Sequence, residues 1–397
     1  MKLIPRPQYL QRLIDVVNTP DIKIITGIRR CGKSKLLDAF RKYLADSDAS
    51  ANIISIDFND LKFEPLTEYH ALHQYVEEHH KDGANNYLLI DEVQTCPTFE
   101  KAINSLHASE KYDIYLTGSN AFLLSSDLAT LFTGRAIEIE VYPFSLEEYC
   151  RYFEPEDAQA AFDEYVRAGG MAGAYPLRNE ELRYNYVADV FRTLIVRDVK
   201  QKFRIRNTVV LDRLSEYLMD NIGNVTSLTN AAKALNGSGI KVDNKTAVKY
   251  VDYLCNAFLF YAVRRYDIRG KKYLAKLNKY YLADHSFRYA LLGTKNMDFG
   301  HTYENIVAVE LMRRGYDVYA GYLYNKEIDF VALKRNEKLY IQVSDNISDP
   351  DTFAREVTPL LAIKDAYPKL LIARTRHEEY DHEGVRILDL PAWLLAK

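Results

Sequence analysis

A glycine-lysine loop near the start of the chain carries the strongest chemical signal in this sequence. The segment TGIRRCGKSKLL follows the apolar run DIKII, and its Gly27, Gly32, Lys33 and Ser34 satisfy the pattern G-x-x-x-x-G-K-[ST]. Such a loop surrounds phosphates with backbone N–H groups, and the helix that it opens adds its dipole. We expect Lys33 to reach the β- and γ-phosphates of ATP and Ser34 to ligate Mg2+. The residues expected to form this site are Gly27, Ile28, Arg29, Arg30, Cys31, Gly32, Lys33, Ser34 and Lys35.

Two carboxylates follow a second apolar run. The segment YLLIDEVQ predicts a strand that ends in Asp91 and Glu92. Asp91 at a strand end can hold the Mg2+ shell, and Glu92 beside it can polarise the attacking water. An isolated Asp-Glu pair is typical of a solvated strand end, but after a glycine-lysine loop it indicates catalysis.

A third polar group follows another predicted strand. In YDIYLTGSN, a strand ends in Thr117, Gly118, Ser119 and Asn120. A polar side chain next to the carboxylate strand can contact both the attacking water and the γ-phosphate, and Ser119 and Asn120 are candidates for this role. Ser119 can equally well cap the helix that follows it. The sequence leaves these two interpretations open.

A sheet must hold these motifs together, and the residues from Asp21 to Val141 predict one. Short apolar, β-branched runs alternate there with helical stretches, which is typical of parallel strands joined by crossover helices. The expected strands are DIKIIT, ANIISIDF, NNYLLID, YDIYLTG and AIEIEV. The expected helices are SKLLDAFRKYLA, TEYHALHQYVEEHH and FEKAINSLHAS. We therefore predict a five-stranded α/β domain.

Four motifs together resemble those of a known family. GIRRCGKS, IDEVQ, TGSN and TGRAIEIEVYPFSLEEY, in this order and at these spacings, are similar to segments of AAA ATPases from bacteria and archaea. The resemblance covers essentially the whole chain. It implies a P-loop NTPase core of the additional-strand, catalytic-glutamate type, with Glu92 as the glutamate and the strand order 5-1-4-3-2. It also implies a C-terminal domain with the fold of PD-(D/E)XK nucleases.

The same resemblance draws attention to a Gly-Arg pair before the last core strand, here Gly134 and Arg135. An arginine at that place can stabilise the γ-phosphate of its own subunit or of a neighbouring one. Arg29 and Arg30, inside the loop, compete for this role. A surface ion pair is the alternative interpretation of Arg135.

Beyond the sheet the pattern is helical up to about Ser227, which predicts a helical lid or connector. Two further helices, TSLTNAAKAL and DNKTAVKYVDYLCNAFL, come next. They are followed by FLFYAVRRYDIRGKKYLAKLNKYYLAD, which predicts a β-ribbon with its turn at DIRGKK. Two helices and a ribbon are typical of a winged-helix domain.

The predicted ribbon is rich in cations. It also contains Tyr266 and Tyr273, and Asp267 is the single acidic residue between Arg264 and Lys279. Such a surface suits contact with a nucleic-acid backbone, without sequence specificity. Winged helices also bind proteins, and charged ribbons are often solvated, so DNA and a protein partner both remain open. The cations are Arg264, Arg265, Arg269, Lys271, Lys272, Lys276 and Lys279, and Lys233, Lys241, Lys245 and Lys249 extend the patch.

The last third of the chain returns to a mixed α/β pattern. Glu304 on a helix, Asp329 on a strand and the strand YIQVS resemble the core of a PD-(D/E)XK nuclease. In that chemistry the carboxylates hold metal and a lysine orients the nucleophilic water. Gln342 stands here in place of a carboxylate and Ser344 in place of the lysine, which weakens metal binding and removes the positive charge. We expect the fold without the cutting activity. Two lysines that could take over the missing role are Lys326 and Lys338.

The predicted organisation has four segments. They are an AAA-type P-loop ATPase core at 1–150, a helical lid or connector at 151–205, a winged-helix domain at 206–285 and a degenerate nuclease-like (restriction-endonuclease-like) α/β domain at 286–397. The function that fits them is Mg-dependent ATP hydrolysis coupled to a conformational change of a DNA- or partner-binding module. The alternatives are a nucleotide switch with little turnover and an ATP-gated, structure-selective nuclease.

Composition limits the remaining classes. The sequence is 48% hydrophobic and 27% charged, as in globular proteins with a core. Its four cysteines show no C-x-x-C pairing, so neither a zinc site nor a disulfide framework is indicated. No apolar run approaches the roughly 18 residues that a membrane span needs. We expect a cytoplasmic protein without a membrane partner, and a homo-oligomer remains open.

Overall fold

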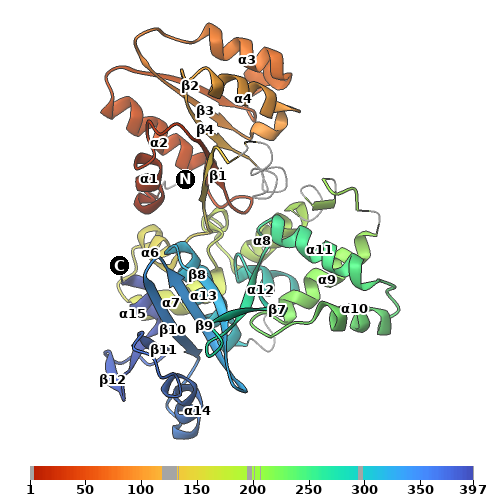
Figure 1. Cartoon of the computed structure of the whole chain (residues 1–397), viewed down its shortest axis with the longest axis vertical. Helices are drawn as coiled ribbons and strands as arrows, with labels where there is room; N and C mark the ends of the chain where they lie inside the picture. Colours follow the sequence, from red (N-terminus) through yellow and green to blue (C-terminus); the bar gives the residue numbers. More distant parts are fainter. Residues whose placement is uncertain are drawn as a thin grey trace. The chain divides into compact units, whose positions relative to one another are not determined.

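The structure is a computed structural model that describes residues 4–118, 132, 134–194, 199–200, 202–205, 207–293 and 298–396 (Figure 1). The described residues form two compact units. The N-terminal unit lies within Met1–Val141 and Arg197–Lys202, and the C-terminal unit lies within Tyr142–Val196 and Phe203–Lys397. The finer division into four segments stays a prediction.

A parallel five-stranded sheet forms the centre of the N-terminal unit. Its order, β2-β3-β4-β1-β5, is the order 5-1-4-3-2 that the family resemblance implied, and every neighbouring pair is parallel. All residues of β1 are buried, which agrees with a strand covered on both faces. The strands are β1 (Ile22–Thr26), β2 (Ala51–Asp57), β3 (Asn85–Asp91), β4 (Asp113–Thr117) and β5 (Ala136–Glu140).

Helices cover both faces of this sheet. Helix α2 lies on one face, and α3 and α4 lie on the other (Figure 1). Ile24 and Ile90 of the sheet belong to one buried cluster with Leu72 of α3 and Ile103 of α4. The helices are α1 (Pro7–Ile14), α2 (Lys33–Ser47), α3 (Tyr69–Glu78) and α4 (Phe99–Ala108). Because the strands are parallel, the ends of β1, β3 and β4 meet at one edge of the sheet, where the glycine-lysine loop and Asp91 lie.

The C-terminal unit begins with the predicted helical stretch. Ser145 starts it with a capping box, in which its side chain accepts from the N–H of Glu148 and the Glu148 side chain accepts from the N–H of Ser145. The helices of the unit are α6 (Leu146–Phe153), α7 (Ala158–Ala168), α8 (Glu180–Thr193), α9 (Thr208–Asp220), α10 (Leu228–Gly237), α11 (Asn244–Asn256), α12 (Ser286–Leu292), α13 (Phe299–Arg313), α14 (Pro350–Leu361) and α15 (Leu390–Leu395). The two helices predicted before the ribbon are α10 and α11.

An eight-stranded mixed sheet with the order β12-β13-β11-β10-β9-β8-β6-β7 completes this unit. Its strands are β6 (Phe260–Asp267), β7 (Lys272–Leu282), β8 (Asp317–Leu323), β9 (Lys326–Lys334), β10 (Glu337–Ser344), β11 (Lys369–Ala373), β12 (Tyr380–His382) and β13 (Val385–Asp389). Strands β6 and β7 form the predicted ribbon, and their pairing is antiparallel.

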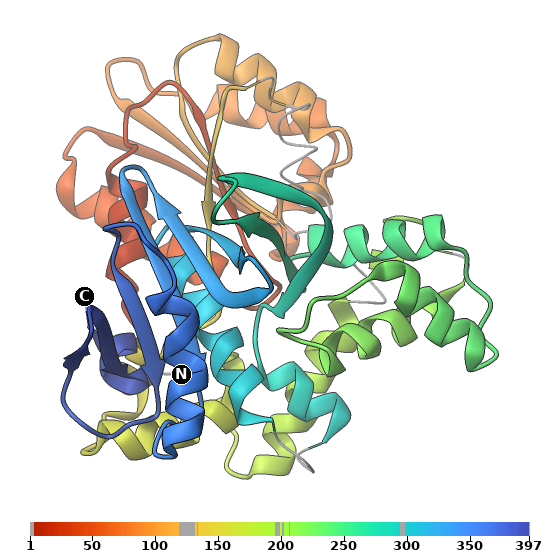
Figure 2. The same cartoon turned by 60° about the horizontal axis from the view of Figure 1, so that its bottom comes forward.

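The ribbon does not stand apart from the last third of the chain. Strand β6 also pairs with β8 in parallel, with Arg265 opposite Ala320, so the ribbon extends the sheet that the sequence assigned to the last segment alone. Figure 2 shows the green ribbon running beside the blue strands of this sheet. The pairing covers an edge of β8 that would otherwise expose backbone donors and acceptors.

Candidate functional site

The loop between β1 and α2, here called the phosphate loop, contains two backbone conformations that favour glycine. Gly27 has a φ of 129° and Gly32 a φ of 102°, a range that L side chains rarely adopt. A Cβ on Gly27 would lie 2.0 Å from the carbonyl oxygen of Val141. Val141 follows β5 and donates a 2.9 Å hydrogen bond to the carbonyl of Thr26. The loop therefore turns directly against the end of β5, and a side chain at position 27 has no room there.

Lys33, the first residue of α2, turns its side chain back onto the phosphate loop. The side chain is buried, and its Nζ lies 2.8 Å from the carbonyl oxygen of Gly27 and 3.2 Å from that of Ile28. The ammonium group thus lies at the loop that is expected to surround the phosphates. This position fits the contact predicted for Lys33.

Two strand ends and the start of α2 meet at Asp91. Its carboxylate accepts a hydrogen bond from Thr117 Oγ1 at the end of β4, and the hydroxyl of Ser34 lies near it. Burial raises the pKa of Asp91 above its ordinary value, the hydroxyls of Thr117 and Ser34 oppose this shift, and the carboxylates of Glu92 and Asp57 add to it. Oxygen donors of this kind suit Mg2+, so the residues present fit a Mg2+–nucleotide group. The sequence predicted Ser34 and Asp91 but treated Thr117 as no more than a strand end.

Glu92 is held by its neighbours in an uncommon conformation. Its φ is 56°, in the left-handed region that glutamate rarely adopts. Its N–H donates a 3.2 Å hydrogen bond to Thr117 Oγ1, and Gln94 Nε2 donates to its carboxylate. Backbone strain of this kind is concentrated at functional sites. The sequence analysis did not single out Gln94, although the residue belongs to the motif IDEVQ.

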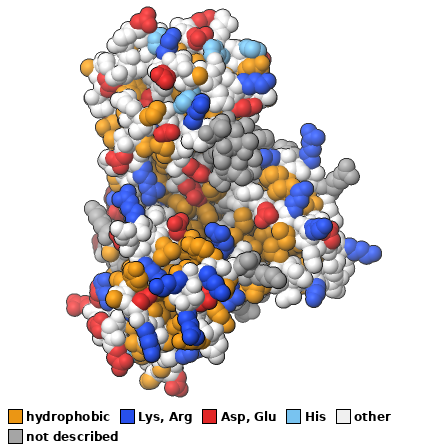
Figure 3. Space-filling model, in the orientation of Figure 1, with side chains coloured by type: hydrophobic (Ala, Val, Ile, Leu, Met, Phe, Trp, Pro, Cys, Tyr) orange, Lys and Arg blue, Asp and Glu red, His pale blue; other side chains and the backbone are white. Residues whose placement is uncertain are grey.

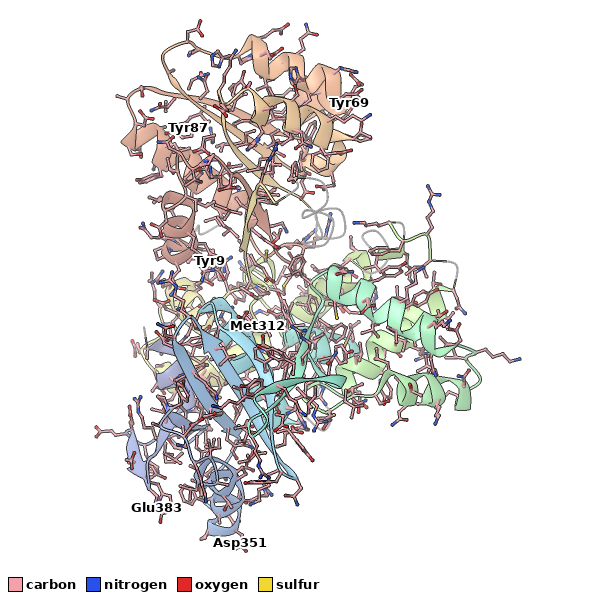
Figure 4. All side chains as sticks on the ribbon, viewed as in Figure 1. Tyr9, Tyr69, Tyr87, Met312, Asp351 and Glu383 are labelled. Carbon is pink, nitrogen blue, oxygen red and sulfur yellow. The ribbon has the colours of Figure 1, made fainter. Side chains whose placement is uncertain are left out.

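Arg6, another residue that the sequence analysis did not single out, contacts the phosphate loop from the N-cap position of α1. Its side chain is buried, and Nη1 donates a 2.8 Å hydrogen bond to the carbonyl oxygen of Cys31. The guanidinium lies 4.3 Å from the ring centroid of Tyr9, which is labelled in Figure 4. Burial raises the pKa of the Cys31 thiol, and Lys33 and Arg6 oppose this shift. Cys31 therefore contributes its backbone to the loop rather than a reactive thiolate.

Arg135 lies at the opposite end of the strands from the phosphate loop. It precedes β5, which runs parallel to β1 with Ala136 opposite Ile22, the first residue of β1. The phosphate loop follows the last residue of β1, so about 13 Å of strand separates the two places at about 3.3 Å per residue. The side chain of Arg135 is exposed.

The remaining candidates of the N-terminal unit lie in and around the loop. Arg29 is half-buried, and Arg30 is exposed with a φ of 64°. Lys35 is exposed on α2, where its Nζ lies 3.2 Å from the carboxylate of an aspartate one turn further along. Ser119 and Asn120 lie outside the described residues, so their roles stay predictions.

The cations of the ribbon differ in their surroundings. Arg264, Arg269, Lys271 and Lys272 are exposed, and Arg265 is half-buried. The side chain of Lys276 lies outside the description. Three arginines lie over tyrosine rings, at 5.6 Å for Arg264 and Tyr273, 4.5 Å for Arg265 and Tyr322, and 5.3 Å for Arg269 and Tyr324. Figure 3 shows Lys and Arg side chains among hydrophobic ones on the visible face of the C-terminal unit.

Lys279 departs from this pattern, because it is buried. Its Nζ lies 2.7 Å from Glu304 Oε1, 2.5 Å from Glu327 Oε1 and 3.5 Å from Asp329 Oδ1. Tyr281, on the same face of β7, donates a 2.5 Å hydrogen bond to Glu304 Oε1. The structure thus brings the predicted Glu304 and Asp329 together, but around a lysine of the ribbon. We call Lys279, Glu304, Glu327 and Asp329 the Lys279 cluster.

The other residues of the predicted nuclease core have separate partners. The side-chain oxygen of Gln342 accepts a 3.3 Å hydrogen bond from the N–H of Asp329, and Ser344 Oγ donates to a backbone carbonyl of the following turn at 3.1 Å. Lys338 lies 3.6 Å from an aspartate beyond α14, and Lys326 is exposed at the start of β9. The lysine that meets the carboxylates is therefore Lys279, not either of the two that the sequence suggested.

The described residues contain neither a cluster of metal-binding side chains nor a membrane-spanning helix. Within the described ranges, no three His, Cys, Asp or Glu side chains are placed to hold a metal ion. No helix among them is long and apolar enough to cross a membrane.

Family models match two parts of the chain. Residues 19–150 match the model of an AAA domain. Residues 159–298 match a domain of unknown function, DUF8612. The first match contains all five strands of the N-terminal sheet, the phosphate loop and both carboxylates of the IDEVQ motif.

Relatives match this chain over nearly its full length. An uncharacterized protein of Haemophilus influenzae is 36% identical over 400 residues, which cover 99% of this chain and 99% of the relative. An uncharacterized protein of Methanocaldococcus jannaschii is 25% identical and covers 97% of this chain and 88% of its own length. Among solved structures, a Walker-type ATPase of Pyrococcus abyssi is 20% identical with a TM-score of 0.48, and the shared part is 73% of this chain and 96% of that one. DnaA of Aquifex aeolicus bound to AMPPCP is 17% identical with a TM-score of 0.32, over 62% of this chain and 86% of that one.

Proposed function

Since this chain belongs to the family of AAA-domain proteins that includes its Haemophilus influenzae relative, we propose that it binds ATP with Mg2+ and hydrolyses it. One observation carries the proposal. The side chains of Ser34, Asp91 and Thr117 come together beside the phosphate loop onto which Lys33 turns, and Thr117 donates a hydrogen bond to Asp91. Few arrangements other than a phosphate site bring a buried lysine, two hydroxyls and a carboxylate to one helix N-terminus.

Different residues of the chain would contribute to nucleotide binding in different ways. Backbone N–H groups of the phosphate loop hold the phosphates, and Lys33 adds a positive charge next to them. Ser34 and Asp91 would hold Mg2+, which when bound would neutralise charge on the phosphate oxygens. Arg6 supports the loop from behind by holding the carbonyl of Cys31.

Glu92 is the proposed general base. Its carboxylate would take a proton from the attacking water, which requires it to be ionised and oriented. Gln94 donates to Oε2, and Thr117 holds the backbone N–H, so both parts of Glu92 are positioned. Oε1 is the oxygen assigned to the water.

The place of Arg135 favours action on a neighbouring subunit. Its distance along the sheet from the phosphate loop argues against contact with the nucleotide of its own chain. We therefore propose a homo-oligomer in which Arg135 of one copy completes the site of the next. An arginine supplied from a neighbour contributes strongly to phosphoryl transfer.

Helix α13 supports a coupling between the ATPase and the ribbon. Arg313 at its last turn donates a 2.8 Å hydrogen bond to the carbonyl of Pro143, which lies shortly after the end of β5 along the chain. Glu304 near its first turn binds Lys279 of the ribbon. We propose that a movement of the segment around Pro143 is transmitted by this helix to the ribbon and shifts it.

The ribbon supports DNA as the partner. Its exposed cations suit phosphates and its exposed Tyr273 suits a base, and exposed lysines on α10 and α11 lie on the same module. Nothing in such contacts specifies a base sequence, so we propose binding to DNA of any sequence. A protein partner is the competing proposal. The helices α9 to α11 and the ribbon support a winged-helix module, and the C-terminal strands support a nuclease-like fold without cutting activity.

ATP turnover measured with and without DNA tests this function, with the particle mass determined in the same samples. We expect phosphate release that requires Mg2+, that rises with added DNA and that occurs in an oligomer. Turnover by a monomer whose rate does not change with added DNA would support the ATPase activity but contradict DNA as the partner. Binding of ATP without any phosphate release would favour the nucleotide switch instead.

A further inference from the structure

The Lys279 cluster lies outside the ATPase site, and its chemistry differs from what Glu304 and Asp329 alone suggest. We propose that the ammonium of Lys279 is the permanent counter-cation of these carboxylates and takes the place that a divalent metal would otherwise fill. The cluster is then an ion network that joins β7, α13 and β9, and it does not hydrolyse phosphodiesters.

The geometry of the cluster matches an ammonium ion. Three carboxylates from two elements converge on one Nζ, and an ammonium has three donors to offer them. The closest oxygens belong to Glu327 and Glu304, at 2.5 Å and 2.7 Å, and Asp329 follows at 3.5 Å. The side chain of Lys279 is only 2% exposed, so solvent does not compete for these donors.

The carboxylate oxygens of Glu304 and Asp329 are already in close contact with other groups of the protein. Glu304 Oε1 accepts from both Lys279 and Tyr281, and Oε2 faces Gly223, where an added Cβ would lie 2.9 Å away. Asp329 Oδ2 accepts a 2.8 Å hydrogen bond from the N–H of Val343. A divalent ion needs several oxygen ligands around one point, and Lys279 stands at the point where these oxygens meet.

The electrostatics keep Lys279 charged. Burial lowers its pKa, but the carboxylates of Glu304, Asp329 and Glu327 outweigh burial and raise the pKa above its ordinary value. Removal of the ammonium would leave buried carboxylates without a counter-ion, which is far more costly than removal of a complete ion pair. A divalent cation would then be the available replacement.

The single tryptophan of the chain gives a local readout. Trp393 lies on α15, where the Arg314 guanidinium is 4.4 Å from its ring. Its fluorescence during heating reports on the C-terminal unit of the full-length protein. We expect Lys279→Met to lower this transition by about 10 °C, since the loss of one partner of a buried ion network is strongly destabilising. Millimolar Mn2+, added without nucleotide, should restore about half of that loss. Lys272→Met, at an exposed lysine of the same strand, should show neither effect.

Charge-matched and wild-type measurements complete the test. The double variant Lys279→Met with Glu304→Gln should regain part of the lost transition temperature and lose the response to Mn2+. Equal behaviour of Lys279→Met and Lys272→Met would overturn the proposal. If Lys279→Met fails to fold, the response of the wild-type protein to Mn2+ tests the proposal instead. Its Trp393 transition should not respond to Mn2+, and a response that Glu304→Gln abolishes would place a metal at this centre and reject the proposal.

Discussion

Arg6 and Cys31 are joined by a 2.8 Å hydrogen bond from Nη1 of the arginine to the carbonyl oxygen of the cysteine. The same peptide plane carries the N–H of Gly32. Because C=O and N–H of a trans peptide point in opposite directions, a carbonyl held toward Arg6 directs this N–H away from Arg6. Arg6 therefore fixes the orientation of a donor that the phosphate loop would offer to a phosphate.

Arg6→Ala should weaken ATP binding by about tenfold, since a hydrogen bond to a charged donor contributes about 1.5 kcal/mol. Arg6→Lys should recover part of this loss because it keeps the charge. Titration with a fluorescent ATP analogue measures both. Arg12→Ala is the matched control, because Arg12 also lies near the ring of Tyr9, at 5.6 Å. An Arg6→Ala protein that binds as tightly as the wild type would show that the loop keeps its shape without Arg6.

Arg135→Ala should lower ATP turnover by at least about a hundredfold, a conservative part of the effect that such arginines have in phosphoryl transfer. ATP affinity at a single site should change little, because Arg135 lies away from its own phosphate loop. Mixing is the decisive measurement. Lys33→Ala subunits retain Arg135, so a mixture of the two inactive variants should regain turnover. A mixture that stays inactive would contradict action on a neighbour.

Arg264→Glu together with Arg269→Glu should reduce the affinity for duplex DNA by at least about tenfold. Each lost phosphate contact should also lower the slope of log affinity against log salt by about 0.9. Fluorescence anisotropy at several salt concentrations, with two unrelated sequences, measures both quantities. Lys364→Glu, an exposed lysine on the loop after α14, serves as the control. Undiminished binding by the double variant would assign the DNA to another surface.

The N-terminal sheet illustrates what sequence can predict. Apolar runs between helices indicated five parallel strands, which the structure confirms, and it also confirms the strand order that the family resemblance implied. The meeting of Ser34 and Asp91 could also be anticipated, because each belongs to a motif tied to a strand end. Local patterns and motif spacing suffice where function depends on side chains at fixed places in one sheet.

Other contacts leave no such pattern. Arg6 binds a backbone carbonyl, and any residue in place of Cys31 would offer the same carbonyl. Lys279 appears in the sequence as one more cation of a basic ribbon, and only the packing of β7 against α13 separates it from exposed neighbours such as Lys272. The pairing of β6 with β8 rests on backbone groups distant in sequence. Such long-range relationships arise in the folded chain and could not be read from residue types.

The central claim is that Glu92 acts on water while the phosphate loop holds ATP. The measurement that tests it most directly is phosphate release and ATP binding by Glu92→Gln, beside Lys33→Ala and the wild type. Glu92→Gln should bind ATP as the wild type does and release phosphate at least about a hundredfold more slowly, since it lacks the proton acceptor. Lys33→Ala should lose binding. Equal phosphate release by the wild type and both variants would contradict the account.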